Sequence, residues 1–121
     1  MTPCSLRRVY DPPRPGEGLR VLVDRLWPRG VAKDRIDLWL KEAAPSESLR
    51  RRFHAGEEDW AAFRLDYLAE LAHPPGQEAL ARLHGLCVAG PVILLYAVRD
   101  ETHNNAAVLR EALERFAAGL R

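Results

Sequence analysis

Residues 92–98 are apolar at every position, and this run constrains the fold more than any other part of the chain. A strand that keeps one face in water alternates apolar and polar residues, whereas a strand without a polar face is covered on both sides, as in a parallel sheet. A second run of this kind, Val21, Leu22 and Val23, lies within residues 19–26. We therefore expect an α/β fold in which a small, mostly parallel sheet is flanked by helices, as a three-layer domain.

Helix-breaking residues, helix-capping residues and the spacing of apolar residues predict the other helices and strands. The loop at 12–18 is rich in proline and glycine, which oppose regular structure. Ser46 and Asp59 are each placed to accept hydrogen bonds at the start of a helix. We expect a strand at 6–10, an extended segment within 34–42 that carries Trp39, and helices at 46–54, 59–71, 77–89 and 102–118.

The length of 121 residues suits one domain over residues 1–121. The chain is 47% hydrophobic and 29% charged, which is a globular composition. No apolar run approaches the roughly 18–20 residues that cross a bilayer, and the first residues lack a basic stretch followed by an apolar core. These features predict a cytoplasmic protein without a membrane partner.

The chain has two cysteines, and their context favours structural thiols. Cys87 lies among leucines and a valine, which is typical of a buried, inert thiol, whereas Cys4 lies near the terminus. A disulfide between them is the alternative. Because the chain lacks a CxxC motif and its four histidines are scattered, we expect no metal and no cofactor.

The formal net charge is +1, so overall charge gives no bias toward nucleic acid or an anionic membrane. The choice of basic residue is more informative, because Lys33 and Lys41 are the only lysines and all other basic residues are arginines. The planar guanidinium group matches phosphate and carboxylate geometry. We therefore expect a small anionic or polar molecule as the partner.

Ligands of open α/β sheets bind beyond the carboxyl ends of the strands. Two strand ends carry polar side chains, and His103 and His54 are the candidates for proton transfer if the site is catalytic. The sequence leaves open whether the chain is an enzyme. The expected ligand site consists of Asp24, Arg25, Trp27, Arg29, Tyr96, Arg99, His103, Asn104 and Asn105.

Several of these residues have an alternative structural interpretation. Thr102 or Asn104 can simply cap the last helix and leave His103 exposed. Trp27 can pack in the core beside Trp39 or Trp60, since buried tryptophans anchor small cores. His54 can favour the negative end of its helix instead of a ligand.

A combination of short motifs spread over nearly the whole chain resembles the YeaO-like family of bacterial proteins of unknown function, also called domain of unknown function 488. The motifs are VYD at 9–11, LVDRLWPRG at 22–30, Trp39 with APS at 44–46, LR at 49–50, FH at 53–54, LY at 95–96 and HNNA at 103–106.

The resemblance implies a stand-alone cytosolic α/β domain, and it brings no established activity. Broader related families are similar in having a Cys-His-Arg-like cluster where His103, Asn104 and Asn105 stand, which suggests a ligand site at this helix start. The thiol is missing here, so cysteine-based chemistry does not carry over.

Three functional hypotheses follow from the sequence. The first is a protein that binds, or binds and transforms, a small anionic or polar ligand at the strand ends. The second is a nucleic-acid-binding or regulatory module that uses the arginine-rich helix 46–54, although acidic residues at 57–59 balance its charge. The third is an interaction subunit that presents Trp60, Phe63 and Tyr67 to a partner chain. We expect a monomer or a weak homodimer.

Overall fold

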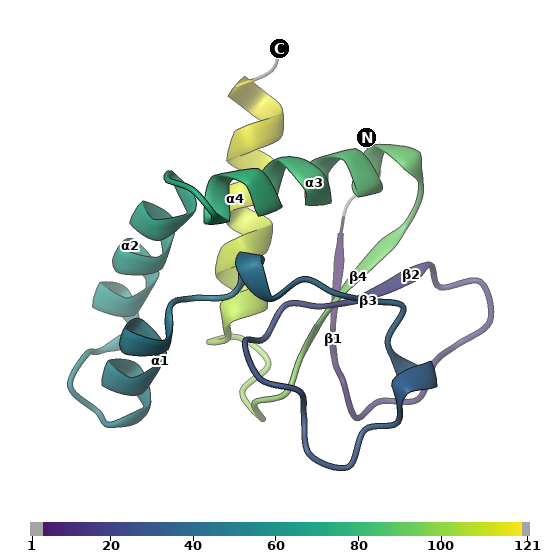
Figure 1. Ribbon diagram of the computed structural model, residues 1–121, viewed down its shortest axis with the longest axis horizontal. Coiled ribbons are helices and arrows are strands. Elements are labelled where there is room, and N and C mark those ends of the chain that lie inside the picture. Colours follow the sequence, from purple (N-terminus) through teal and green to yellow (C-terminus); the bar gives the residue numbers. More distant parts are fainter. Residues whose placement is uncertain (1–3, 120–121) are drawn as a thin grey trace.

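The computed structural model describes residues 4–119. Four strands form one sheet in the order β1-β4-β2-β3, and all three strand pairs are parallel. The strands are β1 (Ser5–Arg8), β2 (Leu19–Leu22), β3 (Leu38–Trp39) and β4 (Val92–Tyr96) (Figure 1). Every residue of β4 is buried, because this strand lies between β1 and β2. The prediction of a small parallel α/β sheet is confirmed.

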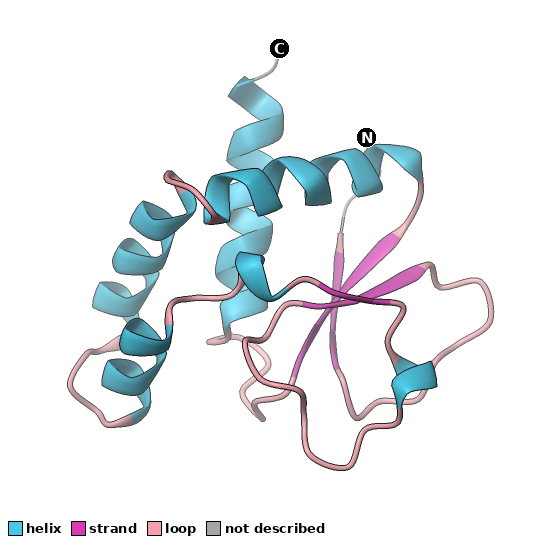
Figure 2. Cartoon of the chain, viewed as in Figure 1, coloured by secondary structure: helices cyan, strands magenta, loops and turns pink. Residues whose placement is uncertain are grey.

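The α-helices pack on one face of this sheet (Figure 2). They are α1 (Glu47–His54), α2 (Trp60–Leu71), α3 (Gly76–Ala89) and α4 (Asn105–Gly119). Alternate strand residues such as Val21 and Leu94 meet helix residues such as Tyr67 and Leu109 in the larger core cluster. Within the described residues, no helix has the length and apolar character that a membrane span requires.

The other face of the sheet is covered by loop structure, where the sequence led us to expect flanking helices. Leu22, Ile93 and Leu95 form a second cluster there with Trp27 and Trp39. The two indole rings pack edge to face, with their centroids 5.4 Å apart. The long connection from β2 to β3 supplies this cover and contains only a short 3-10 helix, η1 (Lys33–Arg35); a second one, η2 (Lys41–Ala43), follows β3. The third layer therefore consists of a connection anchored by tryptophans.

Side-chain caps set the starts of α1 and α2. The Ser46 hydroxyl accepts a hydrogen bond from the Leu49 amide at 3.1 Å, and Asp59 caps α2 in the same way, as predicted. Helix α4 begins three residues later than expected. The reason is Asp100, whose Oδ1 accepts from the Thr102 and His103 amides, at 2.9 Å each, and so holds these residues in a turn.

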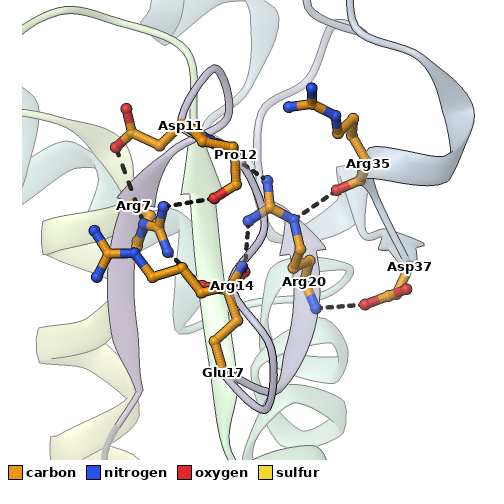
Figure 3. A network of polar contacts seen from close by, with 8 residues as sticks. All are labelled: Arg7, Asp11, Pro12, Arg14, Glu17, Arg20, Arg35 and Asp37. Carbon is orange, nitrogen blue, oxygen red and sulfur yellow. Dashed lines mark hydrogen bonds and ion pairs between the residues drawn. The ribbon is translucent and has the colours of Figure 1, made fainter.

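The proline-rich loop is fixed to the sheet by a network around Arg20, which is only 4% exposed (Figure 3). The Arg20 guanidinium donates to Glu17 Oε1 at 2.8 Å and to the Arg35 carbonyl at 2.7 Å. Arg7 pairs with the same Glu17 carboxylate, and the Arg20 amide donates to Asp37. A buried guanidinium is tolerated here because its charge is paired and its donors are used.

Cys4 and Cys87 are both buried, and their Sγ atoms lie 2.6 Å apart without a disulfide bond. Burial of Cys87 matches the sequence interpretation. Cys4 lies near the terminus and is nevertheless packed in the larger core cluster, where it contacts Cys87 near the end of α3.

Candidate functional site

The ends of β2 and β4 meet, as the parallel topology requires. Leu22 and Leu95 are register partners, and one residue further on the Val23 amide donates to the Leu95 carbonyl at 3.2 Å. The Ala97 amide then donates to Asp24 Oδ2 at 2.9 Å. The two polar segments singled out in the sequence are therefore joined directly at the carboxyl edge of the sheet.

A cavity of about 560 Å³ lies at this edge, between the two strand ends, α1 and the start of α4. Its volume falls in the range usual for small-molecule sites. Among the residues proposed from sequence, it is lined by Asp24, Arg25, Trp27, Arg29, His54, Arg99, His103, Asn104 and Asn105.

Tyr96 is the proposed ligand residue that this cavity does not include. Its ring is 3% exposed and lines a different cavity, together with Leu6 and Arg8 of β1. Tyr96 is the last residue of β4 and packs in the larger core cluster, on the face of the sheet that the helices cover.

Asp24 is the most perturbed ionisable group that lines the cavity. Burial raises the pKa of its carboxyl from 3.8 to about 6. A hydrogen bond from the Asn105 side chain, the hydrogen bond from the Ala97 amide and the charge of Arg50 all act in the opposite direction but do not cancel this effect. A carboxyl that titrates near neutrality inside a cavity is typical of a functional site.

Arg50 also lines the cavity but is not among the expected site residues, because in the sequence it belongs to a run of three charged arginines, 50–52, within the helix 46–54. Its Nε atom is buried and has no hydrogen-bond partner within the described part of the chain. A signal was present in the sequence: Arg50, Phe53 and His54 have the i, i+3, i+4 spacing of one helical face, and all three line the cavity.

The other two arginines of the run are engaged in ion pairs on the protein surface. Arg51 contacts Glu47 at 2.6 Å, and Arg52 contacts Glu58 at 2.7 Å. The three adjacent arginines do not form one cationic stripe, since neighbouring helix residues point in different directions.

The paired asparagines have different roles. Asn104 is 2% exposed; its Oδ1 accepts from the Ala107 amide at 2.9 Å, so it is the N-cap of α4, as the structural alternative held. Asn105 donates from Nδ2 to the Val23 carbonyl at 2.9 Å and hydrogen-bonds Asp24. Asn105 therefore ties the start of α4 to the end of β2 and orients the half-buried carboxyl of Asp24.

The two candidate histidines lie exposed where the cavity opens to solvent. The His103 ring stacks on Trp60, with centroids 4.6 Å apart and an interplanar angle of 12°. His54 ends α1 next to the Phe53 ring. Both histidines can contact a ligand at the opening of the cavity, whereas the Asp24 carboxyl is less exposed than either of them.

Further cationic groups complete the lining. Arg25 uses Nε to donate to the Pro45 carbonyl at 3.0 Å, while Arg29 and Arg99 are exposed. Trp27 lines the cavity although it packs on Trp39 and donates from Nε1 to the Val31 carbonyl at 2.9 Å. Trp27 is thus both a core residue and part of the wall.

Fold and cavity together define a small parallel α/β domain with an arginine-lined cavity at the carboxyl edge of its sheet. The model of the inactive DUF488-N3 subclade matches residues 3–119 of the chain. YeaO of Escherichia coli K12, an uncharacterised protein, is 45% identical over 109 residues, covering 88% of this chain and 93% of YeaO. The chain therefore belongs to the DUF488 family, as one of its YeaO-like members.

Mycobacterial proteins are also similar to this chain. Uncharacterised proteins of Mycobacterium tuberculosis and Mycobacterium bovis are each 39% identical over 114 residues, with 93% of this chain and 94% of theirs covered. No solved structure matches the chain. The names of these relatives assign no activity, so function has to be argued from the cavity.

Proposed function

We propose that the chain is a binding protein for a small organic anion, which it holds in the cavity at the carboxyl edge of the sheet. The observation that carries the proposal is the unpartnered Arg50 Nε, buried at the cavity. Buried donors are nearly always hydrogen-bonded, and leaving one unsatisfied costs about 1–3 kcal/mol. An anionic group of a ligand bound in the cavity would pair with the charge of this guanidinium.

The charges around the cavity support the same conclusion. Four arginines line it, Arg25, Arg29, Arg50 and Arg99, against the carboxyls of Asp24 and Asp100. Because the pKa of Asp24 is raised to about 6, this carboxyl loses part of its charge in mildly acidic solution, and the cavity becomes more cationic.

Binding without chemistry is favoured over catalysis. The matching family model carries the description "inactive", and the two candidate proton carriers, His54 and His103, are exposed at the rim. Asp24 has the perturbed pKa of a general acid or base, but in this proposal it shapes the charge of the binding site.

The two other sequence hypotheses receive less support. In the arginine-rich helix, Arg51 and Arg52 already have acidic partners, which weakens the nucleic-acid hypothesis. Phe63 and Tyr67 are 3% and 0% exposed and belong to the core of this chain, which leaves only Trp60 of the proposed interaction surface.

The test compares Arg50→Gln with Arg51→Gln as the matched control, because the two arginines are neighbours in the same helix. Isothermal titration with phenyl phosphate and cyclohexyl phosphate should detect binding to the wild type and to Arg51→Gln. Removing a buried charge-assisted contact should weaken binding to Arg50→Gln at least tenfold, about 1.4 kcal/mol. Equal loss in both variants, or no binding of either probe to the wild type, would refute the proposal.

A further inference from the structure

The cavity is much larger than an inorganic anion needs. Ligand sites of roughly 300–1,000 Å³ hold organic molecules, and this cavity has about 560 Å³. A phosphate or sulfate bound to Arg50 would leave most of that space to water. The ligand that fits carries an organic body beside its charged group.

The lining shows what kind of body would fit. Of the nine Phe, Trp and Tyr residues and four histidines in the chain, six contribute rings to this one cavity. They come from the loop after β1, the connection after β2, α1, α2 and the turn before α4, and they are Tyr10, Trp27, Phe53, His54, Phe63 and His103.

Four of these rings, those of Phe53, His54, Phe63 and His103, are linked to one another directly or through Trp60. The Phe53 and Phe63 centroids are 4.5 Å apart, and Trp60 stacks on His103 and lies 5.6 Å from Phe63. Rings fixed by such contacts lose little freedom when a ligand packs against them.

Apolar side chains also remain uncovered among the lining residues. Tyr10 is 44% exposed and Leu26 is 59% exposed, and both line the cavity. Large exposed apolar groups that gather at a cavity usually mark a place where a ligand or partner covers them.

We propose that the ligand is an aromatic anion: a planar ring that packs against the ring-lined wall and carries a carboxylate or phosphate held by Arg50. This inference rests on the proposed function and adds the substrate class. Ring packing in preferred geometries adds to ordinary apolar burial, and guanidinium groups are attracted to ring faces, so an aromatic ring gains more here than a saturated ring of similar size.

Two matched pairs of probes isolate the contribution of the ring. Benzoate is compared with cyclohexanecarboxylate, and phenyl phosphate with cyclohexyl phosphate; each pair keeps the charge and nearly the same size. Isothermal titration of the full chain should give dissociation constants about tenfold lower for the aromatic member of each pair, a difference of about 1.4 kcal/mol.

Phe53 is the residue at which to alter the wall, because its ring is half-buried and lines the cavity. Phe53→Leu should reduce the aromatic preference to less than about threefold, because it weakens benzoate binding more than cyclohexanecarboxylate binding. Phe53→Tyr keeps the ring and should keep the preference, even if Phe53→Leu proves too unstable to assay.

The outcomes separate this inference from the proposed function. If aromatic and saturated anions bind equally and both depend on Arg50, the aromatic ligand class is refuted while anion binding stands. If Phe53→Tyr loses the preference, the ring-lined wall is not its origin. If no probe binds, the proposed function itself is refuted.

Discussion

Replacing Asp24 by asparagine should make the protein more stable at neutral pH. The folded structure raises the pKa of this carboxyl from 3.8 to about 6, mainly by burial. At about 1.36 kcal/mol per pKa unit, keeping Asp24 ionised at pH 7 costs the folded state about 3 kcal/mol. Asparagine has nearly the same shape and still offers an oxygen to the Ala97 amide, but it carries no charge.

The sign of the pH dependence follows from the direction of this shift. Between pH 3.8 and about 6 the folded state binds more protons at Asp24 than the unfolded state does, so stability falls as pH rises through this window. Below the window both states are protonated, and the contribution vanishes. Carboxyls whose pKa is lowered, such as Glu17, Asp100 and Glu111, act in the opposite direction but are common to wild type and variant.

The assay is thermal and urea unfolding of wild type and Asp24→Asn at pH 4, 5, 6 and 7. At pH 7 the variant should gain about 2–3 kcal/mol, or about 8–12 °C in Tm at about 4 °C per kcal/mol, and at pH 4 the difference should nearly disappear. Asp34→Asn, at an exposed position of η1, is the control and should change stability by less than about 0.5 kcal/mol. A variant that is less stable at pH 7, or a difference in stability that does not depend on pH, would show that burial of the Asp24 charge does not destabilise the folded state.

Three further predictions concern the framework that holds the cavity. Asn104→Ala removes the N-cap of α4 and should lower the unfolding free energy by about 1–2 kcal/mol in urea titrations; a loss below about 0.3 kcal/mol would contradict its capping role. Arg20→Met breaks the buried network of the proline-rich loop and should lower the unfolding free energy by about 2–3 kcal/mol in the same assay. The loss is smaller than for a buried carboxylate left without any partner, because Glu17 remains paired with Arg7. Oxidised glutathione should oxidise the Cys4 and Cys87 thiols to a disulfide and be reduced to glutathione itself. The intact mass should fall by about 2 Da in the wild type but not in Cys4→Ser. A stable glutathione adduct on the wild type would contradict the pairing of the two cysteines.

The sequence predicted that the ends of β2 and β4 meet, because one physical rule was enough. Two apolar runs without a polar face indicate parallel strands, and parallel neighbours bring their carboxyl ends to one edge. That rule placed Asp24 and Asn105 near each other across more than eighty residues of chain, and the Ala97 and Val23 contacts of these side chains confirm the placement.

Other features depended on information that local patterns do not contain. Arg50 was grouped with its charged neighbours in the sequence, and only the packing of α1 shows which of the three arginines turns inward. The third layer was expected to be helical because buried strands are usually covered by helices, but two tryptophans packed edge to face cover this small sheet instead. Asp100 delayed the start of α4 through a local turn that competes with the helix.

Binding of an organic anion between the two strand ends can be tested directly. The most direct measurement is a titration of the ¹⁵N-labelled protein with phenyl phosphate, followed by ¹H–¹⁵N correlation spectra. The largest shifts should cluster at the amides of Asp24, Arg50, Ala97 and Asn105, all lining residues of the cavity. Shifts centred instead on Arg14 and Arg110, which line a separate cavity beside β1, or spread evenly over surface arginines, would contradict binding between the strand ends.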